Sequence, residues 1–180
     1  MSALEGKEKV GTAQFVNFRL RNEEFGVDVG SVREITRVTD ISAIPEAPAF
    51  IIGVANLRGQ IIPVIDLARQ FGLKPQASLP ESARIVVSEV QGQTVGLLVD
   101  AVPEVLRMAE TDIEPAPELI RTRVRRDYIQ GVGKLGERLI VILDLEKVLA
   151  PSEVDELAQL GVQAEGQRGG VSHGNHSDRR

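Results

Sequence analysis

An internal repeat limits the folds open to this sequence more than any other feature. Residues 24–38 align with residues 94–108 at an offset of 70, and residues 53–67 align with residues 131–145 at an offset of 78. Identical pairs at aligned positions include Gly26 and Gly96, Val32 and Val102, Glu34 and Glu104, Gly53 and Gly131, Leu57 and Leu135, and Asp66 and Asp144. A period of this length is too long for a solenoid repeat and suits two compact modules. The repeat therefore predicts one duplicated unit.

Each repeat has the pattern of a small β unit. A strand, at 14–20 or 83–90, precedes a tight turn, a second strand and a third strand that carries a Val-x-Glu pattern. A Pro-rich connector and a hairpin follow, and the last strand of the hairpin is 61–65 or 139–143. These last strands are apolar throughout, which predicts that both faces are covered. A module of about five antiparallel strands closes its edges by curling into a barrel. We therefore predict a mainly β fold of two five-stranded barrels, with a groove for a partner between them.

The sequence divides into three parts. Residues 1–12 are polar and are expected to form a flexible N-terminus. Residues 13–150 form the expected domain, with a first repeat at about 13–75 and a second at about 83–150. Within residues 151–180, a short helix is expected to precede a tail that has almost nothing apolar to bury, and this tail is predicted to be disordered.

The composition excludes several classes of protein. The chain has no Cys, which removes disulfides, thiolate catalysis and thiolate metal sites. Its net charge of −5 argues against bulk attraction to nucleic acid or anionic lipid. No apolar run reaches the roughly 18 residues that a membrane span needs, and the N-terminus lacks the apolar core of a signal peptide. We therefore expect a cytoplasmic protein.

Catalytic and metal-binding patterns are weak in this sequence. The only histidines, His173 and His176, both lie in the tail, so hydroxyl nucleophiles would lack a neighbouring base. Two tail histidines would chelate a metal weakly, because structural sites usually need three or four placed ligands. Asp66 and Asp144 recur before a short helical segment in both repeats, which favours N-capping over catalysis. We expect no catalytic residue, no metal and no cofactor.

A basic cluster lies within the second repeat. Its members are Arg121, Arg123, Arg125 and Arg126. In a nucleic-acid-binding β protein, four such charges would contact phosphates. Acidic residues flank the cluster, however, and charge runs are usually exposed to solvent. Salt-dependent binding to random DNA would separate the two interpretations.

The hairpin turn of the first repeat carries two informative polar residues, Asn56 and Arg58. Gly59 supplies the backbone freedom that a tight turn needs. The second repeat has Lys134 and Gly136 at the positions of Asn56 and Arg58. Because Gly suffices at that turn, the first repeat carries a cation that the fold itself does not require. Its guanidinium suits bidentate contact with a carboxylate or with backbone carbonyls. The alternative is an idle surface Arg.

A shared carboxylate marks the third strand of each repeat, at Glu34 and Glu104. An exposed carboxylate between apolar neighbours makes a mixed patch of the kind found at protein interfaces. The alternative is a half-buried strand whose polar edge faces water.

Several runs of this sequence resemble the CheW family of chemotaxis coupling proteins. They are EEFGVDVGSVREI and IPEAPAFIIGVANLRGQIIPVIDL in the first repeat, and GLLVDAVPEVL, PAPE, YIQGVG and LIVILDLEKVL in the second. The resemblance spans about residues 13–150 in unbroken order. The run NLRG, followed by an apolar strand and Asp-Leu, is a specific signature in this context.

The resemblance implies two SH3-like β-barrel subdomains and no catalytic activity. Members of the family bind the cytoplasmic tips of chemoreceptors and the regulatory domain of the histidine kinase CheA, and the three form signalling arrays. The resemblance therefore implies an adaptor recruited to membrane-bound receptor arrays, without nucleic acid, small-molecule substrate or membrane insertion. An adaptor of another chemosensory pathway, in pilus motility or second-messenger control, would have the same fold and surfaces.

The resemblance also implies a set of partner-binding residues. They are Val32, Glu34, Gly53, Asn56, Arg58, Gly59, Leu119 and Ile120. Val32, Gly53 and Arg58 would lie on surfaces whose disturbance impairs coupling. Glu34 would face either the kinase or the receptor. The last two residues, which follow the PAPE run, would lie near a second kinase contact that closes rings.

Overall fold

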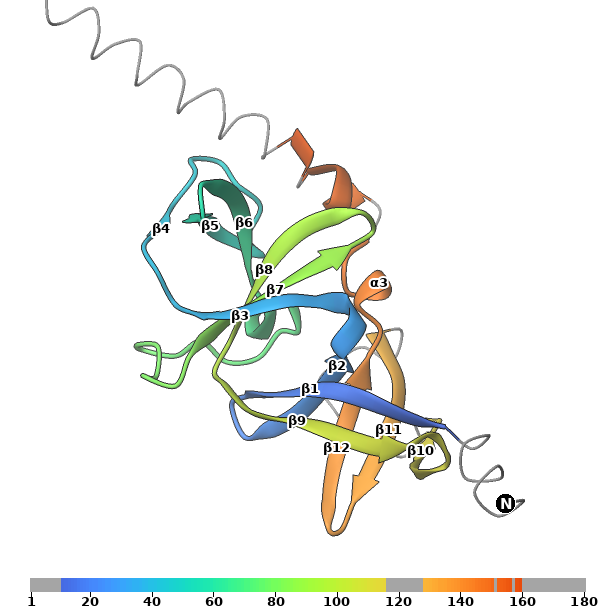
Figure 1. Ribbon diagram of the computed structural model, residues 1–180. Helices are drawn as coiled ribbons and strands as arrows, with labels where there is room; N and C mark the ends of the chain where they lie inside the picture. Colours follow the sequence, from blue (N-terminus) through green and yellow to red (C-terminus); the bar gives the residue numbers. More distant parts are fainter. Residues whose placement is uncertain (1–10, 116–127, 151, 157, 160–180) are drawn as a thin grey trace, which may run out of the picture.

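Two curled β-sheets, connected and followed by short helices, form the molecule (Figure 1). The computed structural model describes residues 11–115, 128–150, 152–156 and 158–159. The predicted fold class is confirmed, because strands dominate and are divided between two sheets. The helices are η1 (Val29–Ser31), α2 (Leu67–Gln70), η2 (Glu110–Asp112) and α3 (Leu145–Val148), and residues 152–156 and 158–159 are also helical.

The strands have the same spatial arrangement in the two sheets. Sheet A has the order β10-β11-β12-β2-β1-β9, and sheet B has the order β3-β7-β8-β6-β5-β4. The strands of sheet A are β1 (Thr12–Leu20), β2 (Glu23–Asp28), β9 (Ala101–Ala109), β10 (Ile113–Glu114), β11 (Ile129–Leu135) and β12 (Arg138–Leu143). The strands of sheet B are β3 (Val32–Arg37), β4 (Ile41–Ser42), β5 (Ile51–Leu57), β6 (Gln60–Asp66), β7 (Arg84–Val90) and β8 (Gln93–Val99). Each sheet exceeds the expected five strands because a two-residue strand, β4 or β10, pairs at its edge.

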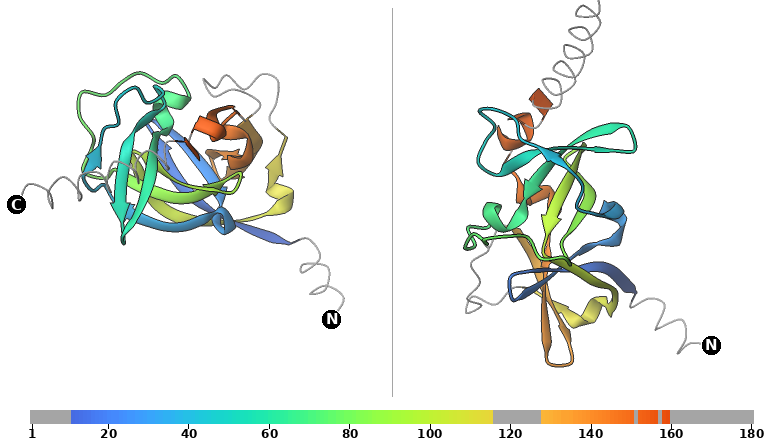
Figure 2. Two further views of the ribbon diagram at one scale, coloured as in Figure 1. Left: turned by 90° about the horizontal axis from the view of Figure 1, so that it is seen from above. Right: turned by 90° about the vertical axis from the view of Figure 1, so that its left-hand side faces the viewer.

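Each sheet takes one hairpin from the other repeat. The β1–β2 hairpin of the first repeat lies in sheet A, and the β7–β8 hairpin of the second repeat lies in sheet B. Figure 2 shows the blue N-terminal hairpin against the orange C-terminal strands. The parallel contacts that hold the exchanged hairpins have equivalent registers, with Ile142 beside Gly26 in sheet A and Val64 beside Gly96 in sheet B. The duplication is therefore preserved in three dimensions through a reciprocal exchange.

Apolar side chains form a core within each sheet and a larger core that joins the sheets. Sheet B buries Leu57 and Ile85 in its own cluster, and sheet A buries Leu106 in another. The largest cluster contains Phe25 of sheet A and Leu97 of sheet B, together with residues of α2 and α3. Side chains from both sheets are thus buried together along this contact, and the groove for a partner between the barrels stays a prediction.

The two apolar final strands differ in how completely they are covered. In β6, residues 62–65 are buried, as predicted. In β12, Leu139 keeps 55% of its surface exposed, so the prediction of complete cover is wrong for this residue. The reason is that β12 pairs with β2 only at Val141 and Ile142, and Leu139 lies beyond this stretch toward the end of the hairpin.

The predicted helix caps are confirmed at the ends of β6 and β12. The Asp66 carboxylate accepts a hydrogen bond from the Arg69 N–H at 3.3 Å, at the start of α2. The Asp144 carboxylate accepts one from the Glu146 N–H at 3.0 Å, at the start of α3. Each aspartate thereby satisfies a backbone donor that the first turn of a helix leaves free.

Candidate protein-interaction site

The β5–β6 turn holds Arg58 in a backbone conformation that favours Gly. Leu57 ends β5 and Gln60 begins β6, so Arg58 and Gly59 form a two-residue turn. Their φ angles are 55° and 83°, as a type I′ hairpin turn requires. A residue other than Gly in this left-handed region costs about 1 kcal/mol. The turn therefore projects the Arg58 side chain outward, with 84% of it exposed, at some cost to stability.

Glu34 and Arg58, both predicted to bind a partner, lie together in the structure. The Arg58 Nη2 atom is 3.3 Å from Oε2 of Glu34, whose side chain is 30% exposed. Glu34 lies on β3, at the opposite end of the sheet B order from β5. The sheet must therefore curl until β3 approaches the β5–β6 turn. Solvent keeps the strength of such an exposed pair at about 0–1 kcal/mol.

The neighbouring predicted residues have different environments. Val32, at the start of β3, is half-buried and packs against the core that joins the sheets. Asn56 is exposed near the end of β5. Gly53 is buried at a φ of 153°, and a Cβ there would lie 2.3 Å from the carbonyl oxygen of Ser42. Gly53 thus permits the close pairing of β4 with β5, and its effect on a partner would act through the shape of the hairpin.

Sheet A has an ion pair at the corresponding place, which sequence reasoning missed. Arg138 Nη2 lies 3.1 Å from Glu104, the carboxylate that aligns with Glu34, and 2.7 Å from Glu24 on the exchanged hairpin. The hairpin of the second repeat therefore also carries an arginine that contacts the shared carboxylate. The cation stands two positions later in the hairpin, at the position that aligns with Gln60. The alignment of the two hairpins includes this position, but a comparison of the turn residues alone overlooked it.

The ion pair in sheet A is stronger and more enclosed than the one in sheet B. Arg138 donates two hydrogen bonds to Glu24, from Nε at 3.2 Å and from Nη2 at 2.7 Å. The Glu24 side chain is only 17% exposed. Hydrogen bonding to Arg138 lowers the pKa of Glu24 against the opposing effect of burial. This bidentate contact ties β12 to the exchanged hairpin of the first repeat.

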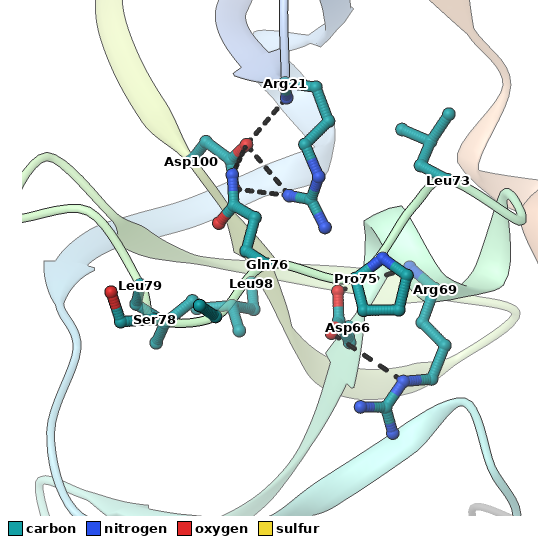
Figure 3. Close-up of a pocket in the computed structure, with 11 residues that line it drawn as sticks. Arg21, Asp66, Arg69, Leu73, Pro75, Gln76, Ser78, Leu79, Leu98 and Asp100 are labelled. Atoms are coloured by element: carbon teal, nitrogen blue, oxygen red, sulfur yellow. Dashed lines mark hydrogen bonds and ion pairs between the residues drawn. The ribbon is translucent and has the colours of Figure 1, made fainter.

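The turn of the β1–β2 hairpin is fastened at the margin of a cavity of about 240 Å³ (Figure 3). The Arg21 N–H donates to Asp100 at 2.6 Å, and its guanidinium donates to both Asp100 carboxylate oxygens at 3.0 and 3.1 Å. The same guanidinium donates to the Lys74 carbonyl at 2.7 and 2.9 Å, and Gln76 also donates to Asp100 at 3.1 Å. These charged groups are occupied by one another, so this network holds the exchanged hairpin in place.

Comparison with known proteins identifies the family. Residues 14–153 match the CheW-like domain family. The chain is 40% identical over 162 residues to the chemotaxis protein CheW of Klebsiella aerogenes, which covers 88% of this chain and 95% of that protein. It is 38% identical over 143 residues to the probable chemotaxis protein CheW of Rhizobium etli, covering 79% and 91%. This chain belongs to the CheW-like domain family.

A solved structure supports both the fold and the role of this CheW-like chain. The scaffolding protein TtCheW from Thermoanaerobacter tengcongensis is 37% identical, with a TM-score of 0.71, and the match covers 79% of this chain and 91% of that one. The curated relatives are chemotaxis proteins. The CheW-like chain therefore acts as an adaptor or scaffold in chemotaxis signalling.

The predicted residues of this CheW-like chain are only partly described. The structure joins Glu34 to Arg58 and places Asn56 and Gly59 on the same hairpin. Leu119, Ile120, the basic cluster, both tail histidines and the predicted flexible tail lie outside the described residues. Within the part of the chain that the structure describes, no helix is long and apolar enough to cross a membrane. No three His, Asp or Glu side chains gather there as a metal site would need.

Proposed function

We propose that this CheW-like adaptor couples the cytoplasmic tips of chemoreceptors to the regulatory domain of the histidine kinase CheA. It acts by binding alone, without catalysis, in the cytoplasm at membrane-bound receptor arrays. Family membership supports this role, and the exposed Glu34–Arg58 pair is the observation that supports a contact surface at this end of sheet B. Its mechanism requires two binding surfaces on one rigid body, which the joined cores of the two sheets supply.

The Glu34–Arg58 pair is suited to exchange its internal contact for a partner. A guanidinium has five N–H donors, and the single contact with Glu34 leaves most of them for carbonyls or carboxylates of another chain. The internal pair is weak in water, so giving it up costs little. Once a partner excludes water, the same charges interact more strongly and fix the orientation of the complex.

A second contact with the kinase would involve Leu119 and Ile120, which follow the PAPE run that resembles the family. Two separate contacts with the kinase would allow adaptor and kinase to alternate in a ring. Individually weak contacts then gain strength through multivalency. A receptor movement would change kinase activity only if it altered the contacts differently in the two activity states.

Titration calorimetry tests the proposal directly. This protein is titrated with a CheA regulatory domain from the same genome, as wild type and as the variants Arg58→Ala and Glu34→Ala. We expect Arg58→Ala to weaken binding about tenfold, as an interface hot spot does. Lys134→Ala is the matched control. Lys134, on the β11–β12 hairpin of sheet A, also forms an exposed ion pair at 3.3 Å, in its case with Glu114 on β10.

The outcomes separate a partner contact from a structural pair. Loss of binding in Arg58→Ala, with a Tm close to that of the wild type and normal binding by Lys134→Ala, supports the proposal. If the charge exchange Glu34→Arg with Arg58→Glu restores full binding, the pair acts only within this chain and the contact surface lies elsewhere. If the wild type binds neither the kinase domain nor receptor tips, the coupling function is excluded.

A further inference from the structure

Two arginines face each other across neighbouring strands of sheet B. Strands β3 and β7 are antiparallel, and Arg37 is directly opposite Arg84. Side chains at directly opposite positions project from the same face of a sheet. Like charges in this arrangement destabilise the sheet. The stability of the fold therefore does not explain why two arginines stand at these positions.

The aligned position in sheet A shows that the fold does not require the second arginine. Arg107 on β9 aligns with Arg37, and its opposite residue on β1 is Gln14. Gln14 in turn aligns with Arg84 in the repeat. A neutral side chain thus serves at this position in sheet A, and sheet B alone has a pair of cations.

The two guanidinium groups keep donors free for another molecule. Nη1 of Arg84 donates to the carbonyls of Glu81 at 3.2 Å and Ala83 at 2.7 Å, which fixes the orientation of the group. Arg37 is exposed. Among the described residues, no acidic side chain forms an ion pair with either arginine. A guanidinium held by carbonyls and lacking a carboxylate is preorganised for an external anion.

A surface hollow of about 530 Å³ lies beside the pair. Its lining residues are Arg37, Val38, Leu79, Pro80, Glu81, Ala83 and Arg84. Leu79 is one of the few large apolar side chains that remain exposed, at 47%. The hollow therefore joins a doubly cationic wall to an apolar one, and Glu81 adds a single negative charge to its lining.

We propose that this hollow binds an acidic segment of a protein partner. One carboxylate lies between Arg37 and Arg84, and an adjoining apolar side chain packs against Leu79. A polyanion such as nucleic acid or an anionic membrane needs a broader basic surface, and the chain's net charge of −5 opposes it. Side chains alternate between faces along β3, so Arg37 projects away from the face that carries Glu34. The site is thus separate from the surface in the proposed function.

NMR titration of the isotopically labelled full chain tests this site without the kinase or the receptor. The probe is the capped peptide Ac-GLEELG-NH2, and the matched control is Ac-GLQQLG-NH2, which has the same shape without charge. We expect saturable shifts at Arg37, Arg84 and the residues that line the hollow with the acidic peptide alone. Arg37→Gln and Arg84→Gln should each weaken binding at least fivefold, whereas Arg107→Gln, which removes the aligned arginine in sheet A, should leave it unchanged.

Stability provides a second readout that a structural role would not produce. Removing one of two facing cations should leave Tm unchanged or slightly higher in Arg37→Gln, while binding falls. The proposal is overturned if the uncharged peptide binds as tightly as the acidic one, or if Arg107→Gln weakens binding as much as Arg37→Gln does. It is also overturned if the acidic peptide causes no shifts at a concentration of about 20 millimolar, where even weak peptide binding would be detected. Tighter binding of a DNA duplex or phosphatidylserine vesicles to the same residues would also overturn it, in favour of a polyanion.

Discussion

The hairpin ends of the two sheets contain the same kinds of charged group but use them differently. In sheet A, Arg138 joins Glu104 and the enclosed Glu24, and its own side chain is 37% exposed. In sheet B, Arg58 reaches Glu34 alone and is 84% exposed. The first arrangement connects strands that belong to different repeats. The second connects one strand to a turn and leaves most of its cation in water.

The difference arises from a displacement of the cation by two residues within the hairpin. Arg138 stands at the start of β12, beside the exchanged hairpin, where its guanidinium can reach two carboxylates. In sheet B the aligned positions of Arg138 and Glu24 are Gln60 and Thr94, which cannot form an ion pair. Sheet B therefore has no counterpart of the Arg138–Glu24 ion pair. Its arginine on the turn is available for a role outside the fold.

The largest loss of stability in this comparison is expected when the aligned glycines of the two hairpins, Gly53 and Gly131, are changed. Gly53→Ala should lower the free energy of unfolding by about 3 kcal/mol, because a strained φ and a severe clash add together. An added Cβ would lie 2.3 Å from the Ser42 carbonyl oxygen. Gly131→Ala, the aligned change, should cost less, since its Cβ would lie 2.8 Å from the Glu114 oxygen and its φ is not positive. Urea denaturation of both variants measures the difference, and equal losses would contradict it.

A second test replaces each hairpin arginine with the same uncharged side chain. Arg138→Met should lower Tm clearly, because Glu24, only 17% exposed, would lose a bidentate partner. Arg58→Met should leave Tm nearly unchanged, because both its charge and its stem are in water. Thermal unfolding followed by circular dichroism compares them under identical conditions. A similar fall in both variants would mean that the two hairpin ends are structurally equivalent.

A smaller effect should follow from the pKa of Glu24. Its folded-state pKa is lowered by hydrogen bonding to Arg138, so it stabilises the protein above its ordinary value of 4.5. This contribution is lost as pH falls below 4.5 and through the lower folded pKa. Glu24→Gln should therefore destabilise at pH 7, with the difference from the wild type shrinking in acid. Denaturant unfolding across pH measures this, and the pH dependence of the difference should disappear in an Arg138→Met background.

The sequence predicted the β class and the helix caps, and it singled out Glu34 and Arg58 separately, but it did not predict that they pair or how the repeats share strands. Each repeat contains a complete set of strands, which gives no indication that the β1–β2 and β7–β8 hairpins pair with strands of the other repeat. Pairing between distant strands has no local sequence signal. The contacts that depend on the exchange, such as Arg138 with Glu24 and Arg21 with Asp100, were missed for the same reason.

The smallest effect on stability is expected when the charge pattern of sheet A is moved into sheet B. The double change Arg58→Gly with Gln60→Arg places Gly on the turn and an arginine where Arg138 stands in the other hairpin. The new arginine should reach Glu34 as Arg138 reaches Glu104, and Gly relieves the left-handed strain at the turn, so Tm should change little. Binding to the kinase domain and to receptor tips should nevertheless fall as far as in Arg58→Ala. Full binding by the double variant would show that the fold needs only a cation near Glu34, and that its projection from the turn has no separate purpose.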